Sequence, residues 1–158
     1  MNIRIGFGYD VHRLEEGLPL VIGGMIIPHH KGGLGHSDAD VLIHAIMDAL
    51  LGAAGLRDIG VHFPDNDPSL KKIDSKILLS RTMELIKEQG YVISNVDATV
   101  CLEKPKISNY IPEMIRVLAM LLEVSETQVS VKATTNEGLG FVGNEQGITA
   151  YAVALLSK

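Results

Sequence analysis

Asp10, His12 and His44 are the side chains whose types and positions most favour metal chemistry. Asp10 and His12 are two residues apart in a predicted β-strand, so both leave the same face, about 7 Å apart at Cα. His44 lies in a predicted helix, with Asp40 and Asp48 four residues before and after it. Two imidazoles and one carboxylate can hold a zinc ion and leave the fourth tetrahedral position open for a substrate.

A simpler interpretation of these residues is also open. Asp10 and His12 would then be an ordinary pair near a strand end, and His44 a hydrogen-bonded helix histidine. Asp40 and Asp48 favour the metal interpretation, because a carboxylate beside a ligating histidine fixes its tautomer and raises its basicity. Spacing alone does not decide between the two.

Two further polar clusters suit an anionic ligand. His36-Ser37-Asp38 precedes a predicted helix, where free backbone N–H groups and the helix dipole favour anions, and His36 could donate to a phosphate oxygen. The segment 132–137 ends a predicted strand with a lysine, two threonines and a glutamate. Lysine and threonine bind phosphate oxygens, and a glutamate can hold Mg²⁺ against a diphosphate. A solvated helix cap and a polar strand end are the alternatives.

Two motifs suggest chemistry that the rest of the chain does not support. Gly138 to Gly143 spells G-x-G-x-x-G, but a dinucleotide site needs a full βαβ unit and an acidic residue about twenty positions later. Only 15 of the 158 residues follow Gly143. Cys101 has no histidine near it in sequence, so it is interpreted as a strand residue rather than a nucleophile.

Composition limits the class of protein. A chain of 158 residues with 46% hydrophobic residues predicts one domain over residues 1–158. It has no apolar run long enough to span a membrane, and its start does not resemble a signal peptide. One cysteine suits a reducing cytoplasm, and a formal charge of −5 argues against nucleic-acid binding. An anionic substrate would therefore need locally concentrated positive charge, which metal ions supply.

Strands and helices must alternate to position these residues. Ser37 with Asp40 resembles an acidic capping box, and Gly23-Gly24 predicts a small hairpin between two short strands. Residues 55–73 have no clear period and are expected to be a loop. The expected strands are 3–12, 20–22, 25–27, 96–103 and 129–133, and the expected helices 37–54, 74–89, 111–122 and 147–156. This order predicts an α/β sandwich.

Many of these segments, taken in order, resemble the 2-C-methyl-D-erythritol 2,4-cyclodiphosphate synthase family of the non-mevalonate isoprenoid pathway. The resemblance covers nearly the whole chain. Its motifs are Gly8-Tyr9-Asp10-Val11-His12, His36-Ser37-Asp38-Ala39-Asp40, His44, Asp48-Ala49-Leu50-Leu51-Gly52-Ala53, Asp58-Ile59-Gly60, Phe63-Pro64-Asp65, Pro105-Lys106, Lys132-Ala133-Thr134-Thr135, Glu137 and Gly140-Phe141.

The resemblance implies a phosphorus–oxygen lyase that closes a cyclic diphosphate and releases CMP from a cytidine diphosphate substrate. It implies a zinc ion on Asp10, His12 and His44, and a second ion, Mg²⁺ or Mn²⁺, on Glu137. The implied fold is a two-layer sandwich, with a mixed sheet and helices on one face of it. The sheets of three subunits would pack around a trimer axis. The active sites would lie between subunits of this homotrimer. His36 and Thr135 match positions that stabilise the transition state. The implied substrate-binding residues are Ser37, Asp58, Ile59, Gly60, Phe63, Pro64, Asp65, Asn66, Asp67, Leu102, Glu103, Lys104, Pro105, Lys106, Lys132, Thr134 and Phe141.

One position departs from the family pattern. Family members often carry an arginine where this chain has Asn144, and that arginine points into a cavity on the trimer axis. The departure argues against isoprenoid diphosphate binding there. Two rival functions remain at this stage: a metal-dependent phosphodiesterase that uses zinc-bound water, and a non-catalytic trimer that binds isoprenoid diphosphates.

Overall fold

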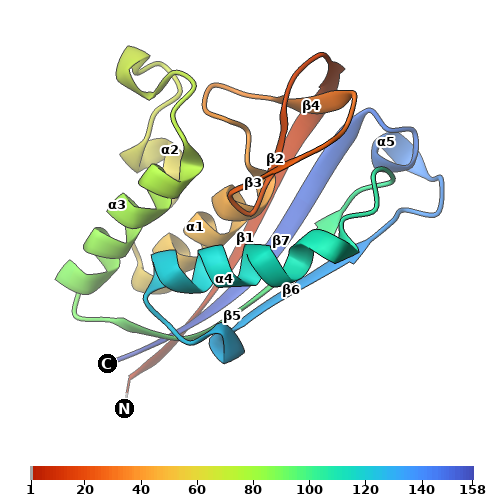
Figure 1. Ribbon diagram of the computed structural model, residues 1–158. Coiled ribbons are helices and arrows are strands. Elements are labelled where there is room, and N and C mark those ends of the chain that lie inside the picture. Colours follow the sequence, from red (N-terminus) through yellow and green to blue (C-terminus); the bar gives the residue numbers. More distant parts are fainter. Residues whose placement is uncertain (1) are drawn as a thin grey trace.

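A five-stranded mixed sheet forms one layer of the protein, and the computed structural model describes residues 2–158 of it. The strand order is β4-β1-β7-β5-β6 (Figure 1). Neighbouring strands are antiparallel except β5 and β6, which run parallel. The strands are β1 (Ile3–Glu16), β4 (Lys31–Leu34), β5 (Val92–Cys101), β6 (Val129–Thr134) and β7 (Gly147–Ser157).

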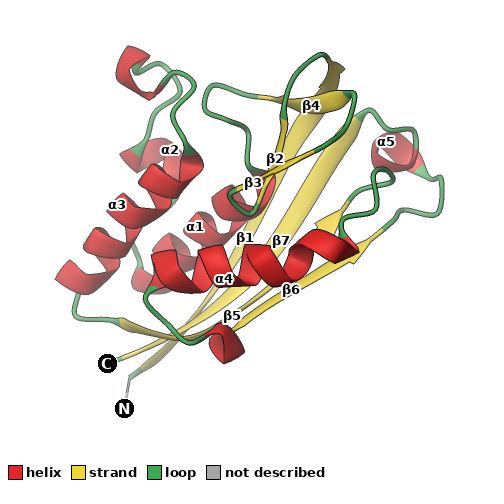
Figure 2. Cartoon of the chain, viewed as in Figure 1, coloured by secondary structure: helices red, strands yellow, loops and turns green. Residues whose placement is uncertain are grey.

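Three helices cover one face of this sheet, which confirms the expected α/β sandwich (Figure 2). They are α1 (Val41–Ala54), α3 (Ser75–Glu88) and α4 (Ile111–Leu122). The predicted hairpin is present as β2 (Leu20–Ile22) and β3 (Met25–Ile27). The loop expected at 55–73 contains two short helical turns, α2 (Ile59–His62) and a 3₁₀ turn (Pro68–Leu70). A further short helix is α5 (Gly140–Gly143), and 3₁₀ turns lie at Ser108–Tyr110 and Glu126–Gln128.

The segment 147–156, expected to be a helix, is instead strand β7 at the centre of the sheet. It is rich in alanine and leucine, which favour helices when considered alone. Its buried residues alternate, however, with Ala150, Ala152 and Ala154 under the helices and Tyr151 and Val153 on the opposite face. Pairing with β1 on one side and β5 on the other outweighs the local propensity.

Helix α1 begins at Val41, four residues later than expected. Asp40 is its N-cap, and its carboxylate accepts from the Ile43 N–H at 3.0 Å. Ala39 has a left-handed backbone with φ of 58°, so the chain between Ser37 and Asp40 cannot be helical. The capping box expected at Ser37 is therefore wrong.

Two glycines in β1 let α1 lie directly against the strand. A Cβ atom on Gly6 would lie 1.8 Å from the Ala49 carbonyl oxygen, and one on Gly8 would lie 1.9 Å from that of Ala45. Side chains on alternate residues of a strand share a face, so Asp10 and His12 continue the same face beyond Gly8. The close approach therefore brings β1 and α1, which carry the three predicted metal ligands, together.

Candidate metal centre and substrate cavities

The ligand atoms of Asp10, His12 and His44 converge on one point. Asp10 Oδ2 lies 2.8 Å from His12 Nε2 and 3.1 Å from His44 Nδ1, and the two ring nitrogens are 3.2 Å apart. A tetrahedral zinc ion with bonds of about 2.0–2.1 Å would hold neighbouring ligand atoms roughly 3.3 Å apart. The spacing of the three atoms therefore fits one face of such a tetrahedron.

The orientation of His12 also fits a metal ligand. Its Nδ1 lies 3.1 Å from the Leu34 carbonyl oxygen, which can only accept, so Nδ1 carries the hydrogen. In the neutral ring the lone pair on Nε2 therefore faces Asp10 and His44, and in the protonated ring the same atom donates to Asp10. A carboxylate and a lone pair that face the same point are stabilised by a cation.

Asp40 and Asp48 do not hold His44, contrary to the sequence prediction. Asp40 accepts from the backbone N–H groups of Gly23, Gly24 and Ile43, and Asp48 accepts from the Ile59 N–H at 2.8 Å. Both carboxylates therefore join segments of backbone. The Nε2 atom of His44 lies instead 2.9 Å from Ser75 Oγ and 3.2 Å from Ser37 Oγ.

The charges of Asp10 and His12 stabilise each other. Burial raises the pKa of Asp10, but hydrogen bonds from His12 and His44 outweigh it and lower that pKa to about 2. Burial lowers the pKa of His12, but its hydrogen bond to Asp10 and the charge of that carboxylate raise it above its ordinary value. Asp10 is therefore a carboxylate at neutral pH, as a metal ligand requires.

A cavity of about 240 Å³ opens from the metal centre. Its lining includes His36 and Ser37 from the segment before α1, and Phe63 and Asp65 from the loop after α2. His36 Nε2 donates to the Asp67 carbonyl oxygen at 2.9 Å, which joins the 36–38 segment to the loop before α3. Apolar walls come from Ile59, which the resemblance implied, and from four residues that sequence reasoning did not single out: Met47, Leu70, Ile73 and Leu78.

Other residues expected to bind substrate gather at a second cavity, of about 170 Å³, near the ends of β5 and β6. It is lined by Leu102, Glu103, Pro105, Lys106, Thr134 and Thr135, and also by the unpredicted Ile107, Ser108 and Ala133. Glu137 lies beside this cavity: its carboxylate accepts from Thr135 Oγ1 at 3.3 Å. This orients Glu137 but leaves it outside the Asp-His-His cluster.

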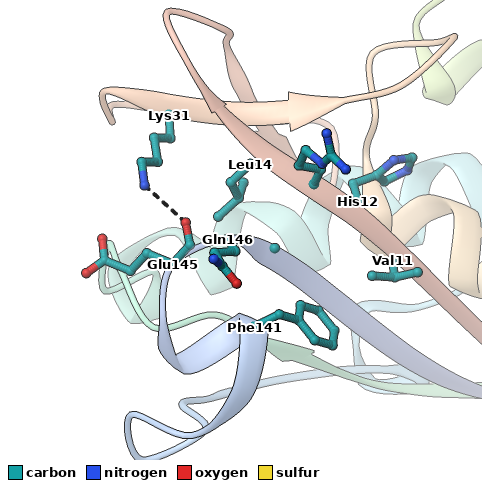
Figure 3. Close-up of a pocket in the computed structure, with 9 residues that line it drawn as sticks. Val11, His12, Leu14, Lys31, Phe141, Glu145 and Gln146 are labelled. Carbon is teal, nitrogen blue, oxygen red and sulfur yellow. Dashed lines mark hydrogen bonds between the residues drawn. The ribbon is translucent and has the colours of Figure 1, made fainter.

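Phe141 lines a third cavity, of about 610 Å³, between β4 and α5 (Figure 3). Lys31 Nζ donates to the Glu145 carbonyl oxygen at 3.1 Å across this cavity. The Phe141 ring covers Gly147, where a Cβ atom would lie 2.7 Å from the ring. His12 lines both this cavity and the metal cavity, whereas Phe141 lines only this one.

Three other predicted substrate residues make contacts within the chain. Asp58 caps α2 by accepting from the Val61 N–H at 3.3 Å. Lys132 pairs with Asp97, and Lys104 pairs with Glu145 at 3.1 Å. Gly60, Pro64 and Asn66 lie in the same stretch as α2 and the following loop, beside the metal cavity's Ile59, Phe63 and Asp65.

The fold and the site define an α/β protein with a mixed sheet and a candidate Asp-His-His centre for a divalent ion. Residues 3–157 match the sequence model of the YgbB family. The chain belongs to this family.

Known proteins with high similarity carry one common name. A 2-C-methyl-D-erythritol 2,4-cyclodiphosphate synthase from Porphyromonas gingivalis is 64% identical over 153 residues, which is 97% of this chain and 94% of that protein. The CDP complex of IspF from Plasmodium falciparum is 40% identical, with a TM-score of 0.85 over 98% of this chain and 96% of that one. The bifunctional IspDF of Campylobacter jejuni is 39% identical with a TM-score of 0.94, and the match covers 98% of this chain but 42% of IspDF. No helix within residues 2–158 is long and apolar enough to cross a membrane.

Proposed function

We propose that this protein converts 4-diphosphocytidyl-2-C-methyl-D-erythritol 2-phosphate into 2-C-methyl-D-erythritol 2,4-cyclodiphosphate and CMP, as a lyase of non-mevalonate isoprenoid synthesis. The observation that carries this proposal is the convergence of Asp10, His12 and His44 in the lining of the metal cavity. The names of the relatives and the CDP-bound structure support the nucleotide substrate. The single cysteine suits a reducing compartment, and we place the reaction in the cytoplasm.

The substrate supplies its own nucleophile. The second pKa of a phosphate monoester is about 6, so the 2-phosphate is mostly dianionic at neutral pH and needs no general base. Its oxygen attacks the β-phosphorus, the bond from that phosphorus to the CMP oxygen breaks, and CMP leaves with that electron pair. The protein must therefore hold two anionic groups together, and such positioning can contribute about 7–11 kcal/mol.

The residues that line the metal cavity would bind the phosphate groups. A zinc ion on Asp10, His12 and His44 would supply a Lewis acid that neutralises and orients phosphate oxygens. His36 and Ser37, on the wall of the same cavity, would donate hydrogen bonds to phosphate.

The nucleotide end belongs at the second cavity. Leu102 to Lys106 would hold the cytosine, Thr134 and Thr135 would contact the diphosphate, and Glu137 would hold Mg²⁺ or Mn²⁺. The loop 63–67 would exclude water, because hydrolysis competes with cyclisation.

Two features support a homotrimer with active sites between subunits. The metal cavity and the second cavity have no lining residue in common, although one substrate must reach both. The sheet face opposite the helices is apolar and exposed, which is typical of a protein interface. Its residues are Ile3, Ile5, Phe7, Tyr9, Val11, Tyr151 and Val153.

Product analysis tests the proposed reaction. The protein is incubated with the cytidyl substrate, Zn²⁺ and Mg²⁺, and CMP and the cyclic product are followed together by phosphorus NMR. We expect equal amounts of both, and no oxygen from isotopically labelled water in the cyclic product. A linear, labelled phosphate would identify a hydrolase instead and overturn the proposal.

A variant of the metal site tests the zinc assignment. His44→Ala removes one of three ligands, so we expect it to lose bound zinc and nearly all CMP release. Zinc content is measured by elemental analysis alongside turnover. Near-normal turnover by the metal-free variant would contradict the assignment.

A further inference from the structure

His44 makes its contacts on the side away from the metal centre with a buried serine. Ser75, the first residue of α3, is fully buried, and its Oγ lies 2.9 Å from His44 Nε2. The same hydroxyl lies 2.5 Å from Asp38 Oδ1. A chain of hydrogen bonds therefore runs from Asp38 through Ser75 to His44, over 37 positions of sequence.

The hydrogen bonds that link Asp38, Ser75 and His44 Nε2 allow only one arrangement of hydrogens. An ionised carboxylate can only accept, so the single hydroxyl hydrogen of Ser75 is donated to Asp38. Ser75 Oγ can then only accept from His44, and His44 Nε2 must carry the hydrogen. A cation at the centre can then bind His44 Nδ1, the atom that faces Asp10 and His12, whereas without a cation Nδ1 donates a hydrogen to Asp10.

We propose that Asp38 and Ser75 are positioning residues that fix the tautomer of His44 and present its Nδ1 lone pair to the metal ion. The inference rests on the proposed metal site and adds two residues to it. It gives His44 the carboxylate that sequence reasoning sought in Asp40 or Asp48. This carboxylate, Asp38, does not contact His44 directly but acts through the hydroxyl of Ser75.

The geometry of Asp38 supports this role. Its Oδ2 accepts from the Ser75 backbone N–H at 2.9 Å, and its Oδ1 also accepts from the Asp40 N–H at 3.2 Å. The carboxylate is thus held between the 36–40 segment and the start of α3. It cannot rotate away from Ser75 without losing both backbone contacts.

The arrangement also leaves the Ser37 hydroxyl available to a ligand. Ser37 Oγ lies 3.2 Å from His44 Nε2 and accepts from the Ala39 N–H at 3.2 Å. Because Nε2 already carries a hydrogen, Ser37 has no acceptor there and keeps its own hydrogen for a group in the cavity. A phosphate oxygen is the acceptor that the proposed substrate offers.

The tautomer can be observed directly in the metal-free wild-type protein. Nitrogen-15 NMR of the histidine rings at mildly alkaline pH distinguishes a protonated ring nitrogen from a bare one. We expect His44 Nε2 to carry a hydrogen. A bare Nε2, with the hydrogen on Nδ1 alone, would overturn the inference, and this measurement needs no variant to fold.

Substitutions then test which residues impose the tautomer. Ser75→Ala removes only the hydroxyl, so His44 should populate both tautomers and Zn²⁺ alone should bind roughly 10–100-fold more weakly. Thr82→Val is the matched control, because Thr82 is a fully buried hydroxyl in the same helix that donates to the Leu78 carbonyl. It should change stability but leave zinc affinity and the His44 tautomer as in the wild type.

The outcomes separate this inference from the proposed function. Zinc affinity of Ser75→Ala within about twofold of wild type, with His44 unchanged in the spectrum, would overturn the positioning role and leave the metal site intact. If the wild-type chain binds no zinc, the proposed metal site is wrong and this inference falls with it. Equal loss of zinc affinity in Thr82→Val would show a general loss of structure and would also overturn the role.

Discussion

Asp58 has a structural contact, and the family resemblance also implies that it binds the substrate ribose. Its side chain caps α2 through the Val61 N–H. We expect Asp58→Ala to raise KM about tenfold, the effect of one lost charged hydrogen bond, with a smaller change in kcat. Steady-state kinetics over a range of substrate concentrations measures both.

A serine at the same position separates the two contacts. Asp58→Ser keeps an oxygen that can cap α2, so stability should return while KM stays high. An unchanged KM in both variants would count against the ribose role.

Asp48 gives a pH dependence through a carboxyl that is not itself a candidate metal ligand, although the charge of Asp10 raises its pKa and that of His44 lowers it. Burial raises the pKa of its carboxyl above the ordinary value, although the Ile59 N–H opposes this. A raised pKa in the folded state means stability that is present below the unfolded pKa of about 3.9 and lost as pH rises through the folded value. Asp48→Asn keeps the acceptor for Ile59 but does not titrate.

We therefore expect the asparagine variant to gain stability relative to wild type as pH rises from about 4 to 7. Urea denaturation at several pH values measures the difference in unfolding free energy. A difference that stays constant with pH would show that the Asp48 pKa is not raised.

The three candidate ligands could be proposed from sequence, but the residues that contact them from behind could not. Asp10 and His12 share a strand face by simple alternation, so their proximity follows from local geometry. Ser75 is 31 positions from His44 and reaches it only because α3 packs beside α1. A buried serine carries no local pattern, and the nearby Asp40 and Asp48 were therefore the obvious, and wrong, partners for His44.

At the scale of elements, the contact of α1 with β1 depends on Gly8. A Cβ atom there would overlap the Ala45 carbonyl oxygen, a backbone atom that cannot rotate away. We expect Gly8→Ala to destabilise the fold by about 3 kcal/mol, the upper end of the usual cost of overpacking, and to weaken zinc binding by moving His44 from Asp10. Thermal unfolding and zinc titration measure the two effects.

Gly52 in α1 is the matched control for this change. Nothing lies within 4 Å of a Cβ atom added there. Gly52→Ala should stabilise the protein by about 0.5–1 kcal/mol, because alanine is the better helix former. Similar effects of the two substitutions would contradict the packing argument.

Helices were predicted correctly where the hydrophobic residues recur with a helical period over a segment long enough to be a helix. The expected helices at 74–89 and 111–122 correspond to α3 and α4. The expected helix at 147–156 was wrong because strand β7 is paired on both edges and carries small residues under α1. Alanine is a strong helix former, so a segment with several alanines is predicted to be a helix unless its pairing with neighbouring strands is known.

At the scale of the whole molecule, the proposed trimer makes a prediction about the exposed sheet face. Phe7 is 63% exposed there, and Glu at this position would place a charge in the proposed interface. We expect Phe7→Glu to yield monomers and to lose activity, because the two ends of the substrate are proposed to be held by different subunits. Light scattering with size-exclusion chromatography gives the mass.

Met120→Glu provides the comparison on a helix, away from that face. Met120 is 69% exposed, so the change in charge and exposure is similar. This variant should keep the mass and activity of the wild type. A wild-type chain that is monomeric and fully active would rule out the shared site.

Strand β1 has two functions on its two sides. Gly6, Gly8, Asp10 and His12 face the helices, and the apolar residues between them face outward. Side chains along β1 therefore alternate between its two faces with a period of two residues. Deleting a single residue between Gly8 and Asp10 would reverse this alternation in the rest of the strand. The carboxylate and the imidazole would then lie on the outer sheet face, and an apolar side chain would lie at the metal centre. One deletion would remove the metal centre and put charge on the proposed subunit contact at once, so β1 can change by substitution but not by a change in length.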